Sequence, residues 1–420
     1  MLTKLKPKNE FSRNVLTLMT GTTIAQAIPL FMSPILTRLY TPEDFGLFAL
    51  FIALVGVISV IASARYEQAI LIPRYDKHAI NIFSLGLFLI FIVTFLTFFI
   101  ILLFKENILS IFNNNLLDDW IYCIPITVFF TALFNLLTNY NNRTKKYKDI
   151  AQATIIKSII LSIVQLSMGF FKSGFSGLIV GQVFSQIFAN LKLAKNIIKD
   201  KSLLTTVSFK NMIILAKKYN NFPKYNVPHA LLGNISSNLP IYIFTPFFGS
   251  AVVGKYSLAM MIVLTPLSII AISIAKVYNQ KLAELHNQKE DTYYFSINIV
   301  KSFLKRVCIP FVVFIVFAPQ IFEIIFGGEW IDSGKYIQIL SIYLILNVIV
   351  SIIAYIPSLL NLQNKAFKIA LLHFVLLSVL LYFSSKFYDI YVSLFLMCLI
   401  NSLILIYNFI WMTRALKEKK

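Results

Sequence analysis

The sequence predicts an all-α polytopic membrane protein, with twelve transmembrane helices arranged in two six-helix lobes. Three observations lead to this fold class. The 420 residues are 58% hydrophobic and 13% charged, with a mean hydropathy of +0.77, whereas soluble domains carry about 25% charged residues. The apolar residues gather in runs long enough to cross a bilayer. The connections between these runs are alternately rich and poor in Lys and Arg.

A bilayer core about 30 Å thick requires about 20 apolar residues in a helix. On this basis the predicted spans are residues 14–37, 45–64, 80–103, 120–137, 154–171, 174–194, 226–249, 252–275, 307–326, 336–360, 366–384 and 388–412. The connection 195–225 divides an N-terminal lobe, 1–194, from a C-terminal lobe, 226–420. Apolar residues within 209–220 recur at helical spacing, which predicts an amphipathic helix on the inner leaflet or an ordinary solvated linker helix.

The Lys and Arg residues predict the orientation of the chain. Of the 38, 30 fall in connections on one side of the membrane and six on the other. Because cytoplasmic loops collect Lys and Arg, both termini are expected in the cytoplasm. Lys157 and Lys192 fall inside runs, near inner ends where a lysine can reach water. The same preference explains the net charge of +20, so no nucleic acid is expected as a partner.

Motifs for catalysis and cofactor binding are absent from the sequence. There is no P-loop, no GxSxG and no HExxH motif, and the three Cys and four His lack metal-ligand spacing. We therefore expect no cofactor, no metal and no catalytic residue.

Two proline-containing spans at equivalent positions indicate an internal repeat. The first span holds Pro29 and Pro34, and the seventh holds Pro240 and Pro246. Six spans per half give both halves the same orientation, so their pseudo-two-fold axis is expected along the membrane normal. The prolines are expected to break these helices beside a central transport site, the alternative being kinks that serve packing alone.

Polar residues within the spans either line a hydrated cavity or hold helices together. The residues predicted to line a cavity are Glu67, Gln26, Asn234, Asn238 and Asn347. Arg65 stands apart because apolar residues resume after it, so the second span either ends at Ser63 or continues to Pro73 and carries Arg65 into a cavity wall. A guanidinium binds phosphate through paired donors. The alternative for Arg65 is an interfacial anchor with Glu67 as its partner.

Several segments resemble a known family. SPILTRLYTPEDFGLFAL (33–50) and ARYEQAILIP (64–73) resemble the start of bacterial polysaccharide flippases. These are the O-antigen and capsule translocases of the multidrug/oligosaccharidyl-lipid/polysaccharide exporter superfamily. AKKYNNFPKYNVPHALLGNISSNLP (216–240) resembles the family's entry into the seventh span, and QKLAEL (280–285) the inner end after the eighth.

The resemblance implies two six-helix lobes around a central cavity, in the bacterial cytoplasmic membrane, that opens alternately to either side. The cargo would be an undecaprenyl-pyrophosphate-linked oligosaccharide unit, flipped to the outer leaflet for O-antigen lipopolysaccharide or capsule. Other surface-polysaccharide assembly proteins are possible partners. In the family, basic residues of the cavity hold the phosphates. Arg65 is the matching position, Lys157 is a second candidate, and Arg38 matches an outer motif in which a structural role is the alternative.

Two other function classes are weighed against the flippase. A drug or ion antiporter of the same superfamily favours membrane-embedded carboxylates, and the predicted spans hold almost none. A polysaccharide polymerase, which is an enzyme, generally needs a large outer loop for its chemistry. The longest outer connection here, 104–119, has about sixteen residues. The sequence therefore favours a flippase that is not an enzyme.

Overall fold

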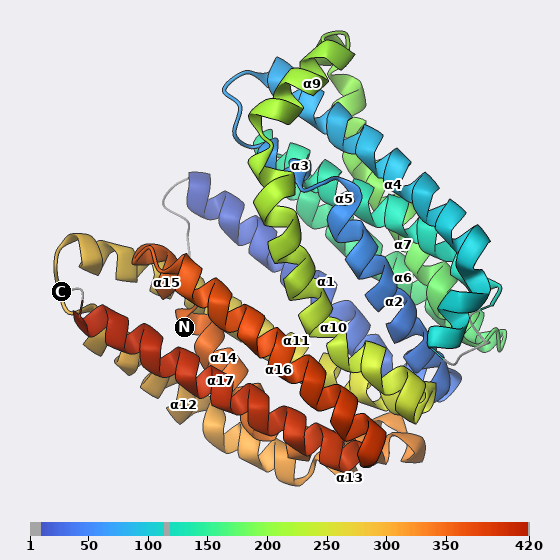
Figure 1. The fold of residues 1–420 in the computed structure, drawn as a ribbon, viewed down its shortest axis with the longest axis vertical. Coiled ribbons are helices and arrows are strands. Elements are labelled where there is room, and N and C mark those ends of the chain that lie inside the picture. The colour runs from blue at the N-terminus through green and yellow to red at the C-terminus, as the bar shows by residue number, and fades with distance from the viewer. Residues whose placement is uncertain (1–9, 113–117, 419–420) are drawn as a thin grey trace. The chain divides into compact units, whose positions relative to one another are not determined.

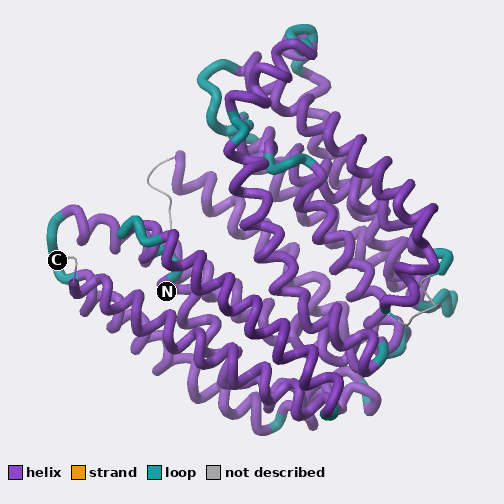
Figure 2. Tube along the Cα trace, in the orientation of Figure 1, coloured by secondary structure: helices purple, strands orange, loops and turns teal. Residues whose placement is uncertain are grey.

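The computed structural model describes residues 10–112 and 118–418, and these residues form helices joined by short loops without any strand (Figure 2). By their contacts the residues fall into two compact units, the first ending at Pro246 and the second beginning at Phe247. The lobe boundary expected from the sequence, 195–225, lies earlier in the chain. The two lobes and their symmetry axis stay a prediction.

The first unit is a bundle of long helices (Figure 1). They are α1 (Glu10–Leu39), α2 (Pro42–Ala62), α4 (Asp76–Ile111), α5 (Cys123–Arg143), α6 (Tyr147–Phe170), α7 (Phe175–Lys199) and most of α10 (Val227–Phe248). Shorter helices occupy the connections: α3 (Tyr66–Ala69), α8 (Lys201–Leu204), α9 (Phe209–Lys218) and the π-helical turn η3 (Phe222–Asn226).

The second unit is built from α11 (Ser250–Asn287), α12 (Thr292–Val316), α13 (Ala318–Phe326), α14 (Ile331–Ile353), α15 (Ile356–Leu359), α16 (Gln363–Phe387) and α17 (Ile390–Glu418). The run 307–326 is not the single straight span that the sequence analysis expects. The chain bends by 69° between α12 and α13. Pro319, at the start of α13, lacks the N–H that would continue the ladder of α12, which explains a break at this point.

Nine helices among the described residues are long and apolar enough to cross a membrane, and the bent pair α12–α13 would make ten. The protein is therefore a multi-pass membrane protein. Helices α1 and α10, expected as the first and seventh spans, have 30 and 22 residues. They fall outside this group because Thr, Gln, Asn and Pro dilute their apolar content. The count of twelve spans stays a prediction.

The prolines of α1 and α10 do not interrupt their helices. Pro29 and Pro34 lie inside α1, and Pro240 and Pro246 lie inside α10. The expectation of helix breaks at these positions is thus wrong in its simple form. A proline removes one backbone donor, and a membrane helix tolerates this loss when neighbouring helices supply other contacts.

The motif LTRLYTPEDFG is a helix junction. Thr41 and Asp44 form a capping box at the start of α2, in which Thr41 N donates to Asp44 Oδ2 at 2.9 Å and Asp44 N donates to Thr41 Oγ1 at 3.2 Å. Tyr40 is buried, and its hydroxyl donates to the carbonyl oxygen of Gln165 in α6 at 2.6 Å. Burial raises the pKa of Tyr40 to about 12, so this donor keeps its proton.

Candidate functional site

The polar segment after α2 forms a reversed turn rather than a longer helix. Helix α2 ends at Ala62, and Ala64 and Arg65 have left-handed φ angles of 50° and 62°. Such a conformation costs a non-glycine residue roughly 1–2 kcal/mol. The alternative in which the second span carries Arg65 onward to Pro73 is therefore excluded. Arg65 instead stands at the N-cap of the four-residue helix α3.

The carboxylate of Glu67 lies between two donors in this turn. Glu67 is 5% exposed. Its Oε1 lies 3.4 Å from an η nitrogen of Arg65, and its Oε2 accepts a hydrogen bond from the Ser63 hydroxyl. The Arg65 side chain is 25% exposed, and its Nε is buried without a hydrogen-bond partner in the part of the chain that the structure describes. One η nitrogen is used by Glu67, so the remaining donors of this guanidinium can bind an anion.

Three neighbouring elements fix the position of the turn. The Tyr66 hydroxyl donates to the carbonyl of Ala216 in α9 at 3.0 Å, and burial raises the Tyr66 pKa. Asn226 in η3 donates to the side-chain oxygen of Gln68 at 3.4 Å. From α5, Arg143 donates to the carbonyl oxygen of Ile70 at 3.1 Å. The connection between α7 and α10 is thus joined to the residues on either side of Glu67.

Arg143 also forms an ion pair with Asp76 at the start of α4, at 2.8 Å. This pair and the bond to Ile70 anchor the far end of the turn to α4 and α5.

Lys157 and Lys192 have different surroundings. Lys192 in α7 forms an ion pair with Asp149 at 3.2 Å, and Asn196 donates to the same carboxylate at 3.0 Å. Lys157 in α6 is half-buried, with Nζ 5.0 Å from the ring centroid of Phe134. No carboxylate pairs with Lys157 among residues 10–112 and 118–418. A lysine on an apolar helix without a counter-ion is a candidate for an anionic ligand.

Asn234 and Asn238 lie together on α10. Asn238 Nδ2 is 3.0 Å from the Asn234 carbonyl oxygen and 3.3 Å from its side-chain oxygen. This polar pair faces α2, because a Cβ added to Gly56 would lie 3.2 Å from Asn234 Nδ2. One turn further along α10, the Tyr242 hydroxyl donates to the carbonyl of Ala53 at 2.7 Å. These contacts fix one face of α10 to α2 within the first unit.

The other predicted site residues are more dispersed. Gln26 and Arg38 are exposed on α1, Arg38 in its last turn. Asn347 is half-buried on α14, in the second unit. The structure brings Arg65 together with Glu67 and Asn234 with Asn238. Whether Lys157, Arg38, Gln26 and Asn347 share a cavity with them stays a prediction.

Comparison with known proteins defines the family. A family model described as polysaccharide biosynthesis protein matches residues 35–335. The chain belongs to this family. The match includes the capped junction at Thr41, the Arg65 turn, Lys157 and all of α10. No curated protein sequence matches the chain.

Solved structures show that this polysaccharide biosynthesis protein has the fold of transporters of the MOP superfamily. The lipid II flippase MurJ, in an inward closed conformation, gives a TM-score of 0.68 at 16% identity, covering 95% of this chain and 90% of that one. An inward-facing MATE family multidrug resistance transporter of the MOP superfamily gives 0.65 at 17%, covering 96% and 95%. A MOP superfamily transporter from Pyrococcus furiosus gives 0.65 at 14%, covering 96% of each chain. The family expected from the sequence is confirmed, and so is an all-helical membrane fold like that of these transporters.

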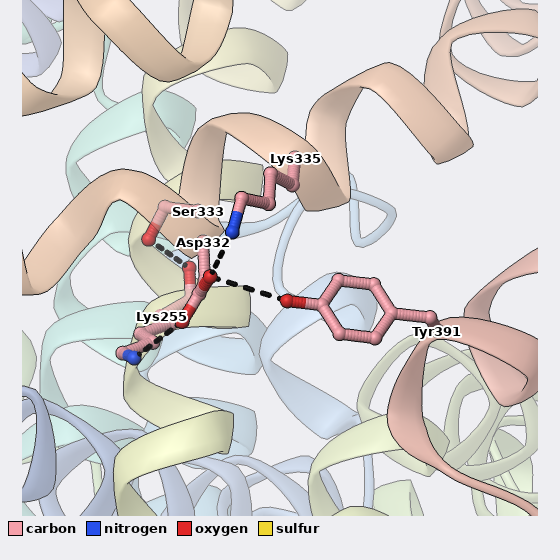
Figure 3. A network of polar contacts seen from close by, with 5 residues as sticks. All are labelled: Lys255, Asp332, Ser333, Lys335 and Tyr391. Atoms are coloured by element: carbon pink, nitrogen blue, oxygen red, sulfur yellow. Dashed lines mark hydrogen bonds and ion pairs between the residues drawn. The ribbon is translucent and has the colours of Figure 1, made fainter.

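A polar network in the second unit was not predicted. Asp332, in the first turn of α14, pairs with Lys255 of α11 at 2.7 Å and with Lys335 at 3.0 Å, and accepts from the Tyr391 hydroxyl of α17 at 3.2 Å (Figure 3). Ser333 donates to the Lys255 carbonyl at 2.9 Å. The sequence carried a signal for part of it, since Asp332 and Lys335 stand in a short connection and Lys255 stands at the start of an apolar run. It could not show that they meet.

Proposed function

We propose that the protein is a flippase for undecaprenyl-pyrophosphate-linked oligosaccharide units. It moves them from the inner to the outer leaflet of the bacterial cytoplasmic membrane by alternating access, for surface polysaccharides such as O-antigen or capsule. The observation that carries this proposal is the Arg65 turn, where the guanidinium has a buried Nε without a hydrogen-bond partner among the described residues. Membership of a polysaccharide biosynthesis family supports the class of cargo.

The chemistry of the first unit agrees with such a cargo. A pyrophosphate needs cations, and Arg65 and Lys157 are cations with incomplete pairing. A sugar chain needs hydrogen-bonding groups, and Asn234 and Asn238 offer them on α10. The lipid tail needs none and can stay in the bilayer. Twelve spans in two lobes, with both termini in the cytoplasm, complete the proposal. The internal repeat supports the two lobes, and the charge distribution of the connections supports the orientation.

The antiporter alternative has one observation in its favour, the buried carboxylate of Glu67. A coupling ion or cationic drug would have to displace Arg65 from this carboxylate, because the guanidinium lies 3.4 Å away. A carboxylate already paired with Arg and Ser63 is better suited to hold the guanidinium in place than to bind a second cation.

The test is transport of a lipid-linked oligosaccharide by the purified full chain in proteoliposomes, together with surface glycan in a strain that lacks its own flippase. We expect R65A to reduce transport by about tenfold or more, since the guanidinium makes charge-assisted bonds to phosphate. R65K should recover part of it, because it restores the charge without the planar donor pair.

The matched control is R74A, which removes an exposed guanidinium nine residues further along the same connection. It should leave transport unchanged. Transport at the control level in R65A, at equal protein level, would exclude Arg65 from the phosphate site. Absence of transport by the unmodified chain, combined with export of cationic drugs, would favour the antiporter instead.

A further inference from the structure

The second unit contains a groove between α11 and α12 with a volume of about 550 Å³. Its walls come from residues between Ile270 and Tyr278 on α11 and between Ile299 and Val307 on α12. Both helices belong to the same compact unit, so the groove is a property of that unit alone.

The walls of this groove are apolar except for two serines, the tyrosine Tyr278 and one cation. Val277, Ile274 and Phe303 contribute aliphatic and aromatic surface, and Val277 is 69% exposed. Arg306 lines the same groove and is exposed. It has neither an ion-pair partner nor a hydrogen-bond partner among the described residues. An arginine on an apolar membrane-protein surface, without a carboxylate nearby, requires another anion or water.

The groove lies where both helices change from apolar to charged sequence. On α11 the segment 256–275 has no charged residue, and Lys276 follows it directly. From α12 into α13 the segment 307–322 has none, and Lys301, Lys305 and Arg306 precede it. Such a change marks the level at which a membrane helix leaves the hydrocarbon for the headgroup region, which is where lipid phosphates lie.

We propose that this groove binds one anionic phospholipid, with its single phosphate on Arg306 and an acyl chain along the apolar wall. A guanidinium matches a phosphate in geometry and charge. The groove offers one cation, since Lys301 and Lys305 on the same helix do not line it. One cation suits a phosphodiester better than a pyrophosphate, so a resident phospholipid fits better than the lipid carrier of a sugar cargo. This site is separate in sequence from Arg65 and goes beyond the proposed transport function.

Native mass spectrometry of the purified full chain can test the site, with phosphatidylglycerol as the probe. Diacylglycerol serves as a lipid with the same chains and no phosphate, and glycerol phosphate as a headgroup without chains. We expect one saturable phosphatidylglycerol adduct and much weaker binding of the other two. R306Q should raise its Kd by about tenfold or more, the loss of a charge-assisted contact.

Two further variants keep the test informative. K305Q removes the exposed cation that directly precedes Arg306 and does not line the groove. It should leave the Kd for phosphatidylglycerol nearly unchanged. V277W fills the groove from an exposed position while keeping Arg306, and should weaken binding as R306Q does. Thermal melting of each variant confirms that it is folded. Equal Kd values for R306Q and K305Q would overturn the proposal, as would tighter binding of undecaprenyl pyrophosphate than of phosphatidylglycerol at Arg306.

Discussion

Arg65 combines a strained backbone with an incompletely paired side chain. Its φ angle of 62° is one that glycine adopts freely and arginine does not. Its guanidinium nevertheless contacts Glu67, whose other oxygen is held by Ser63. Strain of this kind persists when the surroundings determine the conformation, and here Tyr66, Gln68 and Ile70 all bond to other elements. The turn therefore presents the guanidinium in a fixed position.

Lys192 has a carboxylate partner and Lys157 has none among the described residues, so their substitutions should have different effects. K192M should lower the stability of the solubilised protein by about 1 kcal/mol, because it leaves the Asp149 carboxylate without its cation. K157M should leave stability nearly unchanged, because no carboxylate loses a partner and methionine retains the apolar part of the side chain. We expect K157M to reduce transport. Thermal melting in detergent and transport in proteoliposomes measure the two effects, and normal transport by K157M would remove Lys157 from the site.

At the scale of elements, helix packing depends on a few close approaches. Helix α1 meets α6 at Gly21, where an added Cβ would lie 2.4 Å from the Cβ of Ala151. Small residues at such crossings are the usual means of bringing membrane helices together. Helix α7 meets the end of α1 in the same way at Gly177, where the Tyr40 hydroxyl would lie 2.4 Å from an added Cβ.

A pair of glycine substitutions tests this packing. G21A should destabilise the first unit by about 1–3 kcal/mol, since the backbones of α1 and α6 must separate to admit the methyl group. G233A, on α10, is the matched control because no atom of the described residues lies within 4 Å of its added Cβ. Alanine there should stabilise the helix by up to about 1 kcal/mol. Opposite shifts in melting temperature are expected, and a stabilised G21A would contradict the close crossing of α1 and α6.

The sequence predicted the positions of the helices better than their local geometry. Every predicted apolar run overlaps a helix, because length and hydrophobicity determine where a chain can cross a bilayer. The bend at Phe317 and the reversed turn at Arg65 were not settled by the sequence, since both depend on backbone angles selected by neighbouring elements. The ion pairs Lys192–Asp149 and Lys255–Asp332 join residues 43 and 77 positions apart, a distance across which periodicity carries no information.

At the scale of the whole molecule, the charge distribution of the sequence predicts one orientation of the chain in the membrane. The two compact units are each all-helical over their described residues, and successive connections between the apolar runs are alternately rich and poor in Lys and Arg. The fold of these long helices is similar to that of an inward-facing MATE transporter and of the lipid II flippase MurJ.

Reporter fusions test the proposed orientation. Lys145, in the turn between α5 and α6, and Lys172, in the turn between α6 and α7, are both exposed and flank the same helix. A reporter active only outside the cytoplasm should give a signal after Lys172 and none after Lys145. Fusions after Arg74 and Lys386 extend the test to other connections. Reversed signals would place the termini outside and contradict the proposed direction of the chain.

The left-handed pair Ala64–Arg65 has a consequence for directed evolution of this protein. Glycine at either position would relieve backbone strain, and R65G combined with E67Q would also remove a buried charge from the fold. A selection for heat resistance alone should therefore enrich R65G with E67Q, whereas a selection that also demands surface glycan should retain both charged residues. Comparing the two selected populations would identify the positions at which activity requires a less stable residue. This comparison needs no assumption about mechanism.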